Sequence, residues 1–539
     1  MTGGVGARSK QQILRCYVPQ DDRIEEWAGR AAVLASVWRS GFRNAILIDS
    51  SPMRHVLALL ALIAVALPAL PQYDQPYRPQ VHFSPREHWT NDPNGLVFFD
   101  GEYHLFFQYN PFGDVWGHMS WGHAVSKDLL HWEELPVAVP EKDGVMIFTG
   151  SVVVDHENSS GFCKPKTECL VAIYTGYQEH FPGGTRQAQY VAYSVDRGRT
   201  WTNYDKNPVI DLKMADFRDP SVFWDEERHR WVMAVSLPKE HDVQFYSSTN
   251  LKQWALLSEF GQLGDTDGDW ECPDLLRVPS AQDPTKSTWA LKVGLNPGAP
   301  QGGSGEQYFF GAFDGKTFTA SHEKGAHGWT NYGKDDYCAI NFNNIAKDEK
   351  PVLLGWMSNW EYAAKLPTSP WRGQMSLPRR LSFVKDVEGL GLKQEPVVET
   401  LRDGAATTLT SAPREAPFEL QVTFDPKAEQ IFGMRIYSDK EHYVEIGFDR
   451  KNQQLFMDRT KSSVTVAQEF PGTTVAPLTE GRGFDLHVIV DRSSVEAFAQ
   501  DGTIAMNNLV FPTKPQVRVE TFGSKPTSAQ VWKLKSIWK

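Results

Sequence analysis

The stretch that decides the fold is Asp92-Pro-Asn-Gly-Leu-Val-Phe-Phe99, followed by the turn Asp100-Gly-Glu102 and by Tyr103-His-Leu-Phe-Phe107. It consists of an apolar strand, a polar turn and a second strand rich in aromatic residues. The unit recurs four more times, and the first strands of these copies are Gly150–Asp155, Asp219–Trp224, Glu271–Leu276 and Tyr337–Ile340.

A second element separates the units, a turn that ends on tryptophan. Its copies are Ser126-Lys-Asp-Leu-Leu-His-Trp132, Ser194-Val-Asp-Arg-Gly-Arg-Thr-Trp201 and Ser248-Thr-Asn-Leu-Lys-Gln-Trp254. Units that repeat every roughly 50 to 70 residues, each with about four strands, are typical of propeller blades. We therefore predict an all-β protein with a five-bladed β-propeller over residues 78–370. An ordinary multi-sheet protein is the alternative, but it does not explain the repeated Asp-Pro strand starts.

The repeat stops after Pro370, and the rest of the chain reads differently. We predict a linker over 371–413 and a β-sandwich domain over 414–539. The sandwich prediction rests on alternating apolar and polar positions. These occur in Phe418–Phe424, Tyr443–Phe448, Phe484–Val490 and Val495–Phe498.

Three of the first strands begin with a carboxylate, namely Asp92, Asp219 and Glu271. The innermost strands of propeller blades surround one axis, so we expect these three side chains to meet there. Like charges in one cavity drive pKa values apart, so one carboxyl can hold its proton while another is ionised. Glycoside hydrolysis requires this division between an acid and a nucleophile or base.

Seven further residues are candidates for binding the substrate. An arginine beside Asp219 offers a forked, permanently charged donor, with a surface ion pair to Asp216 as the alternative. Amide and hydroxyl side chains can orient sugar hydroxyls, and aromatic rings can stack against a sugar. The seven are Asn91, Gln108, Trp116, Phe148, Thr149, Arg218 and Trp360.

The bulk composition narrows the class of ligand. The 539 residues carry a net charge of −11 and 18 tryptophans. An acidic chain offers no electrostatic footprint for nucleic acid, so we expect none as a partner. A neutral polar ligand such as a carbohydrate suits the aromatic content, although most tryptophans are expected to serve as core.

The N-terminal segment is predicted to be a targeting signal. Basic residues at Arg54 and His55 precede an apolar run from Val56 to Leu70. This run has the length of a signal-peptide core and is short for a membrane span. We expect a signal peptide over 53–72, a doubtful upstream extension over 1–52, and a secreted protein, extracellular or periplasmic, without stable membrane insertion after cleavage. An N-terminal membrane anchor is the alternative.

The five cysteines give no metal-binding pattern. Cys163 and Cys169 lie in one loop and could pair in an oxidising compartment. Cys272 and Cys338 are read as isolated, and no Cys/His spacing typical of zinc is present. We expect neither a metal nor an organic cofactor.

Several motifs resemble glycoside hydrolase family 32, the invertases, exo-inulinases and levanases. Three of them contain the carboxylates, and the others lie in order along residues 78–539. They are Trp89-Thr-Asn-Asp-Pro-Asn-Gly95, Phe217-Arg-Asp-Pro220, Trp270-Glu-Cys-Pro273, Phe106-Phe-Gln-Tyr-Asn-Pro111, Trp116-Gly-His-Met-Ser-Trp-Gly-His123, Phe148-Thr-Gly-Ser151, Trp356-Met-Ser-Asn-Trp360, Arg372-Gly-Gln-Met-Ser-Leu-Pro-Arg379 and Asp491-Arg-Ser-Ser-Val-Glu-Ala-Phe498.

The resemblance implies a five-bladed propeller with a C-terminal β-sandwich and retention of anomeric configuration. It implies that Asp92 is the nucleophile, Glu271 the general acid/base, and Asp219 the carboxylate that holds fructosyl hydroxyls. The seven residues named above match positions that line the fructosyl pocket. The implied substrates are levan, inulin or sucrose, and the motif at Trp116 looks most like levanases and exo-inulinases.

Three other functions stay open at this point. A fructosyltransferase shares every catalytic motif and differs only in its acceptor. An inverting five-bladed hydrolase of arabinan or xylan also uses three carboxylates, but its base would activate water directly. A catalytically inactive carbohydrate-binding protein would release no fructose from any substrate.

Overall fold

The computed structural model describes residues 73–387, 389–409, 415–425, 427, 429–462, 464, 466–515 and 518–538. The predicted extension and signal peptide, 1–72, lie outside these residues, as does Cys16. The described part of the chain belongs to one compact unit. It holds no helix with the length and apolarity that crossing a bilayer requires.

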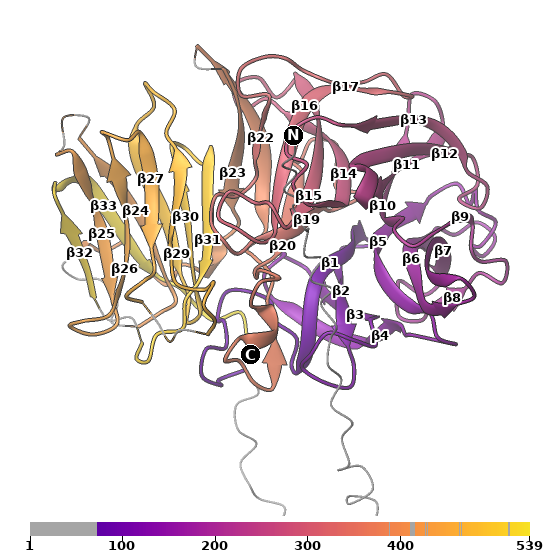
Figure 1. Ribbon diagram of the computed structural model, residues 1–539, viewed down its shortest axis with the longest axis horizontal. Helices are drawn as coiled ribbons and strands as arrows, with labels where there is room; N and C mark the ends of the chain where they lie inside the picture. The colour runs from indigo at the N-terminus through magenta and orange to yellow at the C-terminus, as the bar shows by residue number, and fades with distance from the viewer. Residues whose placement is uncertain are drawn as a thin grey trace, which may run out of the picture. The chain divides into compact units, whose positions relative to one another are not determined.

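Five antiparallel sheets follow one another along the chain and form the blades of a propeller (Figure 1). Blade one contains β1 (His88–Phe99), β2 (Glu102–Asn110), β3 (Ser120–Ser126) and β4 (Trp132–Val139). Blade two contains β5 (Met146–Asp155), β6 (Cys169–Phe181), β7 (Gly184–Ser194), β8 (Thr202–Asn203) and β9 (Ile210–Met214). Blade three contains β10 (Arg218–Asp225), β11 (Arg230–Leu237), β12 (Asp242–Ser248) and β13 (Ala255–Gly261).

The fourth and fifth blades complete the ring. Blade four contains β14 (Asp269–Pro279), β15 (Ser287–Asn296), β16 (Gly305–Phe313), β17 (Phe318–Ala320) and β18 (His327–Trp329). Blade five contains β19 (Tyr337–Asn341), β20 (Val352–Trp356), β22 (Arg379–Asp386) and β23 (Gly389–Pro396). The innermost strands contact each other in the cyclic order β1, β5, β10, β14 and β19, and β19 contacts β1. The five-bladed prediction is confirmed.

The predicted linker over 371–413 is wrong for its first half. Strands β22 and β23 hydrogen-bond into the sheet of β19 and β20, so the propeller continues past residue 370. Between β20 and β22 the chain leaves blade five, and β21 (Trp371–Arg372) pairs in parallel with β1 of blade one. This detour interrupts the unit spacing, which is why the repeat cannot be recognised in the sequence beyond residue 370.

Two five-stranded sheets form the C-terminal β-sandwich, drawn in orange to yellow in Figure 1. One sheet has the order β31 (Ile504–Leu509), β30 (Ser494–Ala499), β29 (Phe484–Val490), β24 (Phe418–Phe424) and β33 (Pro526–Lys533). The other has the order β28 (Thr473–Pro477), β27 (Gln454–Asp458), β26 (Tyr443–Asp449), β25 (Ile431–Tyr437) and β32 (Arg518–Phe522). Short 3-10 helices are η1 (Pro238–Glu240), η2 (Ala363–Lys365) and η3 (Glu399–Leu401).

Apolar residues on both faces of the blades explain the near-continuous hydrophobic strands in the sequence. In blade one, Phe106 packs in the cluster shared with blade two, and its neighbour Phe107 packs in the cluster shared with blade five. Alternate side chains of a strand point to opposite faces, so a strand buried on both sides must be apolar throughout. The same packing holds each pair of adjacent blades together.

Candidate active site

Each innermost strand carries a β-bulge near its N-terminal end. At each of these places two residues of the inner strand lie opposite one residue of the next strand. The bulged pairs lie between Thr90 and Pro93, Ile147 and Gly150, Arg218 and Ser221, Glu271 and Asp274, and Tyr337 and Ile340. A bulge turns consecutive side chains away from strict alternation, so neighbouring residues can serve one pocket. All ten candidate site residues except Gln108, Trp116 and Trp360 lie in or directly before a bulge.

The three carboxylates occupy three different places relative to the bulge. Asp92 is the second bulge residue, Asp219 is the first, and Glu271 directly precedes its bulge. The carboxylates that begin these three strands are therefore not at equivalent positions of the bulge. This stagger lets three strands present acids from different directions.

Asp92 is held by short polar side chains. Thr149 Oγ1 donates a hydrogen bond of 2.8 Å to Asp92 Oδ2, while the buried Oδ1 has no hydrogen-bond partner among the described residues. Burial raises the pKa of Asp92 to about 6, against the hydrogen bonds from Thr149 and Asn91, which lower it. The unpartnered oxygen is free to act as a nucleophile once the group is ionised.

Asp219 lies deeper and has its backbone in the left-handed region, with φ of 67°. Its Oδ2 accepts a hydrogen bond of 2.9 Å from the backbone N–H of Cys272, and its own N–H donates to Thr175 Oγ1. Burial raises the pKa of Asp219 to about 7, although the charge of Arg218 opposes this. Glu271 and Asp92 raise it further, which shows that the three acids share one electrostatic environment.

Glu271 is fixed on both carboxylate oxygens. Arg218 Nε lies 3.0 Å from Oε1, and the hydroxyl of Tyr337 donates to Oε2. Tyr337 is buried, and its burial together with the charge of Glu271 raises its pKa well above the ordinary value. The tyrosine therefore remains a hydrogen-bond donor over the whole range in which carboxylates titrate.

Arg218 links the acids to blade two. Its Nη1 donates to Asp216 at 2.8 Å and to Gln187 Oε1 at 3.3 Å. Burial lowers its pKa, but the carboxylates outweigh burial and raise the pKa above the usual value. The ion pair with Asp216 weighed in the sequence is present, and so is the contact with Glu271.

The remaining candidates lie around these acids. Trp89 Nε1 donates to Asn91 at 2.8 Å, and Gln108 in β2 lies opposite the bulge that contains Asp92. Trp116 is 44% exposed, and its ring lies 6.1 Å from that of Phe148. Trp360 stacks on Trp89 at 6.0 Å. Of the seven candidates, only Trp116 is substantially open to solvent.

Sequence reasoning missed Tyr337 and a disulfide. Cys163 pairs with Cys169, which the sequence left open, and Cys272 pairs with Cys338, so the reading of these two as isolated is wrong. The two cysteines lie 66 positions apart, so no local spacing connects them. A usable signal was present, since Glu271-Cys272 and Tyr337-Cys338 stand at the same place in the fourth and fifth units.

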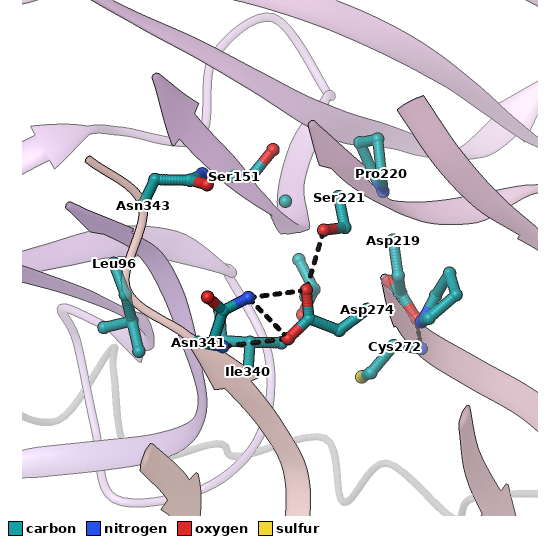
Figure 2. Close-up of a pocket in the computed structure, with 13 residues that line it drawn as sticks. Leu96, Ser151, Asp219, Pro220, Ser221, Cys272, Asp274, Ile340, Asn341 and Asn343 are labelled. Carbon is teal, nitrogen blue, oxygen red and sulfur yellow. Dashed lines mark hydrogen bonds between the residues drawn. The ribbon is translucent and has the colours of Figure 1, made fainter. Parts of the chain in front are cut away.

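A small cavity of about 20 Å³ is lined by residues from the innermost strands of all five blades, among them Asp219 (Figure 2). Figure 2 shows Asp274 on its wall, bonded to Ser221 and Asn341. A space of this size holds about one water molecule. A larger hollow of about 840 Å³ shares Ser221 and Asp274 and lies toward the other ends of the inner strands. The three carboxylates therefore lie toward one end of the inner strands, and the larger hollow lies toward the other end.

Two groups of described residues have the ligand atoms that a metal would need, Asp92 with Cys272 and Cys338, and Asp155 with Cys163 and Cys169. In both groups the two sulfurs are joined to each other. Neither group therefore offers the thiolates that bind zinc.

Comparison with known proteins identifies both domains. Residues 82–396 match the glycosyl hydrolases family 32 N-terminal domain, and residues 389–538 match the glycosyl hydrolases family 32 C terminal domain. The chain is 43% identical over 492 residues to a levanase of Bacillus subtilis (strain 168), a match that covers 86% of this chain and 72% of that protein.

Two solved structures share the architecture. The crystal structure of exo-inulinase from Aspergillus awamori gives a TM-score of 0.80 at 37% identity and covers 86% of this chain and 100% of that one. A β-fructofuranosidase from Schwanniomyces occidentalis complexed with fructosyl-erythritol gives 0.76 at 33% identity, with 87% and 99% covered. The chain thus belongs to glycoside hydrolase family 32 and is a retaining glycosidase that cleaves β-fructofuranosyl bonds.

Proposed function

We propose that the protein is a secreted fructan β-fructosidase that releases fructose from levan, inulin or sucrose by double displacement, with Asp92 as nucleophile and Glu271 as general acid/base. The observation that carries this assignment is the difference between the two acids. Asp92 has a free buried oxygen, whereas Glu271 is fixed on both oxygens by Arg218 and Tyr337. An attacking group needs a free lone pair, and a proton donor needs a fixed direction.

In the first step Glu271 gives its proton to the leaving oxygen while Asp92 Oδ1 attacks the anomeric C2 of the fructosyl ring. The C2–O bond breaks, and a covalent fructosyl ester forms through an oxocarbenium-like transition state. In the second step Glu271, now a carboxylate, takes a proton from water as this water attacks C2. Fructose leaves with its configuration retained, and Asp92 regains its charge.

Asp219 and Arg218 bind the fructosyl hydroxyls in this mechanism. Asp219 is oriented by the backbone of Cys272, whose position depends on the strand that carries Glu271. A carboxylate that binds hydroxyls strengthens its hydrogen bonds as positive charge develops on the sugar. Double displacement requires carboxyls about 5 to 5.5 Å apart, and this is the spacing that the proposal expects between Asp92 and Glu271.

Fructan polymers are the proposed preferred substrates, with sucrose as a weaker one. The similarity to a levanase and to an extracellular exo-inulinase supports this choice. The loop that carries Trp116 also exposes Phe112 and Val115, an apolar surface next to the pocket that a longer chain could cover.

The test is a panel of sucrose, inulin and levan with the products resolved over time, for the native protein and for Asp92→Asn. We expect fructose as the product from the fructans and no release by Asp92→Asn. Activity on sucrose alone would contradict the fructan assignment, and unaltered activity of Asp92→Asn would contradict the mechanism. Transfer products at high sucrose would instead identify a fructosyltransferase.

Secretion is part of the proposal. Two disulfides among the described residues suit an oxidising compartment, and a similar exo-inulinase is described as extracellular. N-terminal sequencing of the exported protein tests it, with a first residue near position 72 expected. A mature chain that retains residues upstream of Met53 would contradict the predicted signal peptide.

A further inference from the structure

The disulfide Cys272–Cys338 joins the innermost strands of blades four and five at their bulges. Cys272 is the first bulge residue of β14 and Cys338 the first of β19. Both have left-handed backbones, with φ of 47° and 46°, and the residues are 2% and 0% exposed. The bridge is therefore an internal link between two blades at the level of the acids.

Each cysteine directly follows one of the two residues that the Tyr337–Glu271 hydrogen bond joins. Glu271 precedes Cys272, Tyr337 precedes Cys338, and the tyrosine hydroxyl donates to the glutamate. The disulfide and the Tyr337–Glu271 hydrogen bond therefore both connect blade four to blade five, through adjacent residues of each strand. A shift of one strand along the other would move the tyrosine away from the acid.

The bridge also touches the other two acids. A carboxylate oxygen of Asp92 and the two sulfurs lie within 4.8 Å of one another, and the Cys272 N–H donates to Asp219. Hydrogen-bonded ladders run within blades and not between β14 and β19, so side chains set the spacing of these two strands. Two further contacts join this part of the fold, because the Asn341 N–H of β19 donates to Asp274 of β14 and Lys292 of β15 donates to the Ala339 carbonyl of β19. The disulfide fixes the spacing of β14 and β19 at the end of the strands where the carboxylates lie.

We propose that Cys272–Cys338 is a positioning element for the general acid/base, so that turnover depends on the intact bridge. This inference rests on the proposed role of Glu271. Breaking the disulfide leaves the fold in place, because the Asn341–Asp274 and Lys292–Ala339 hydrogen bonds and the apolar packing between blades four and five still hold the strands together. It loosens the Tyr337–Glu271 hydrogen bond, and a misplaced proton donor slows the step that breaks the C2–O bond.

The first test compares Cys338→Ala and the double variant C272A/C338A with the native protein. We expect kcat to fall by about 10- to 100-fold, the scale of a misplacement near 1 Å, while KM changes little. A purely structural bridge would lower the melting temperature and leave kcat and KM of the folded protein unchanged.

The matched control is C163A/C169A, which removes the other disulfide. That bridge closes a loop of separation 6 at the C-terminal end of β5, the end opposite the acids, where Cys169 pairs with Asp155. Its removal should leave kcat within about twofold, as expected for a site with no contact to the chemistry. Equal losses in both variants, or unchanged kcat in C338A, would overturn the proposal.

A double-mutant cycle with Tyr337→Phe separates positioning from other effects. If the bridge acts through the tyrosine, C338A should cost much less in the Y337F background than alone, because the two changes share one interaction. Additive losses would contradict the proposed route. Full activity of Glu271→Gln would contradict the proposed role of Glu271 itself. Full activity of C338A would contradict only the role of the disulfide.

Chemical reduction gives an independent measurement if C338A and C272A/C338A do not fold. Dithiothreitol supplies the two electrons and two protons that convert the bridge to two thiols, and it becomes a cyclic disulfide. In C163A/C169A, the fraction of Cys272 that can be alkylated with iodoacetamide, read by peptide mass, should track the loss of kcat and recover on reoxidation. Full activity in the reduced, folded protein would overturn the proposal.

Discussion

Single hydroxyl groups set the roles of the two acids at the residue scale. Thr149 donates to Asp92 and Tyr337 donates to Glu271, so each acid has its own donor from a different blade. A donated hydrogen bond stabilises the ionised carboxylate, whereas burial stabilises the neutral acid. The balance at Asp92 favours the neutral form up to a pKa of about 6.

Removing the acid should affect poor leaving groups most. We expect Glu271→Gln to lower kcat on sucrose by about 10²- to 10⁴-fold, the usual contribution of general acid catalysis. The loss should be smaller on β-D-fructofuranosyl fluoride, because fluoride leaves without a proton. The exposed Glu157 gives the control variant Glu157→Gln, which should behave like the native protein. Equal losses on both substrates would argue against acid catalysis by Glu271.

The acid limb of the pH profile reports Asp92. Below pH 6 the nucleophile is protonated, so kcat/KM should fall about tenfold per pH unit. Thr149→Val removes a hydrogen bond that lowers this pKa, so the limb should move to higher pH and activity at pH 5 should fall more than at pH 7. The exposed Thr319 in β17 supplies the control Thr319→Val. A limb that stays in place would show that Thr149 does not tune the nucleophile.

At the scale of the strand, the bulge is what turns a β-sheet into a catalytic scaffold. Its copies in blades one to four place seven of the ten candidate residues at one end of the inner strands. Gly150 closes the bulge of blade two, and a Cβ there would lie 2.2 Å from the Ile173 carbonyl oxygen of β6. The strand pair can approach this closely only because the residue has no side chain.

Replacing Gly150 by alanine should force β5 away from β6. We expect a loss of about 1 to 3 kcal/mol in the free energy of unfolding, as for other overpacked sites, and a lower kcat because Thr149 moves with the strand. Gly472 has no atom within 4 Å of its would-be Cβ, so Gly472→Ala is the control. Thermal unfolding and kinetics measure both effects, and an unchanged melting temperature for G150A would contradict the close approach.

The sequence allowed the inner strands to be predicted better than the outer ones. Inner strands such as β1 and β10 carry the repeated apolar pattern because both faces are buried. Strand β22 was assigned to a linker because the chain first visits blade one through β21. The Tyr337–Glu271 contact joins residues 66 positions apart, and only the closed ring brings such residues together.

For the whole molecule, a buried ionic cluster ties the propeller segment to the sandwich. His82 Nδ1 lies 2.8 Å from Asp491, and Nε2 lies 3.4 Å from Glu496. Burial lowers the pKa of His82, but the two carboxylates outweigh it and raise the pKa to about 9. Asp491 also accepts from the backbone of Gln80 and Val81, so one carboxylate fixes the entry into the first blade.

The stability of the two-domain unit should therefore depend on pH on the alkaline side. His82 has a folded pKa above its unfolded value of 6.5, so its contribution is complete below about pH 6.5 and is lost as pH rises through 9. The melting temperature of the native protein should fall as the pH rises through this window. The His82→Gln variant should have a lower melting temperature that changes less with pH. His322 outside the cluster offers the control His322→Gln. A variant H82Q with the native pH slope would rule out this role for His82.

The short strand β21 has a consequence for a chain that is still being made. The ribosome delivers Asp92, Asp219 and Glu271 well before Trp371 and Arg372, yet these two residues pair with β1 across the last gap of the ring. A nascent polypeptide that has emerged only as far as residue 360 contains all three carboxylates but lacks β21 and the outer strands β22 and β23 of blade five. Hydrolysis should therefore begin only after translation has passed this point.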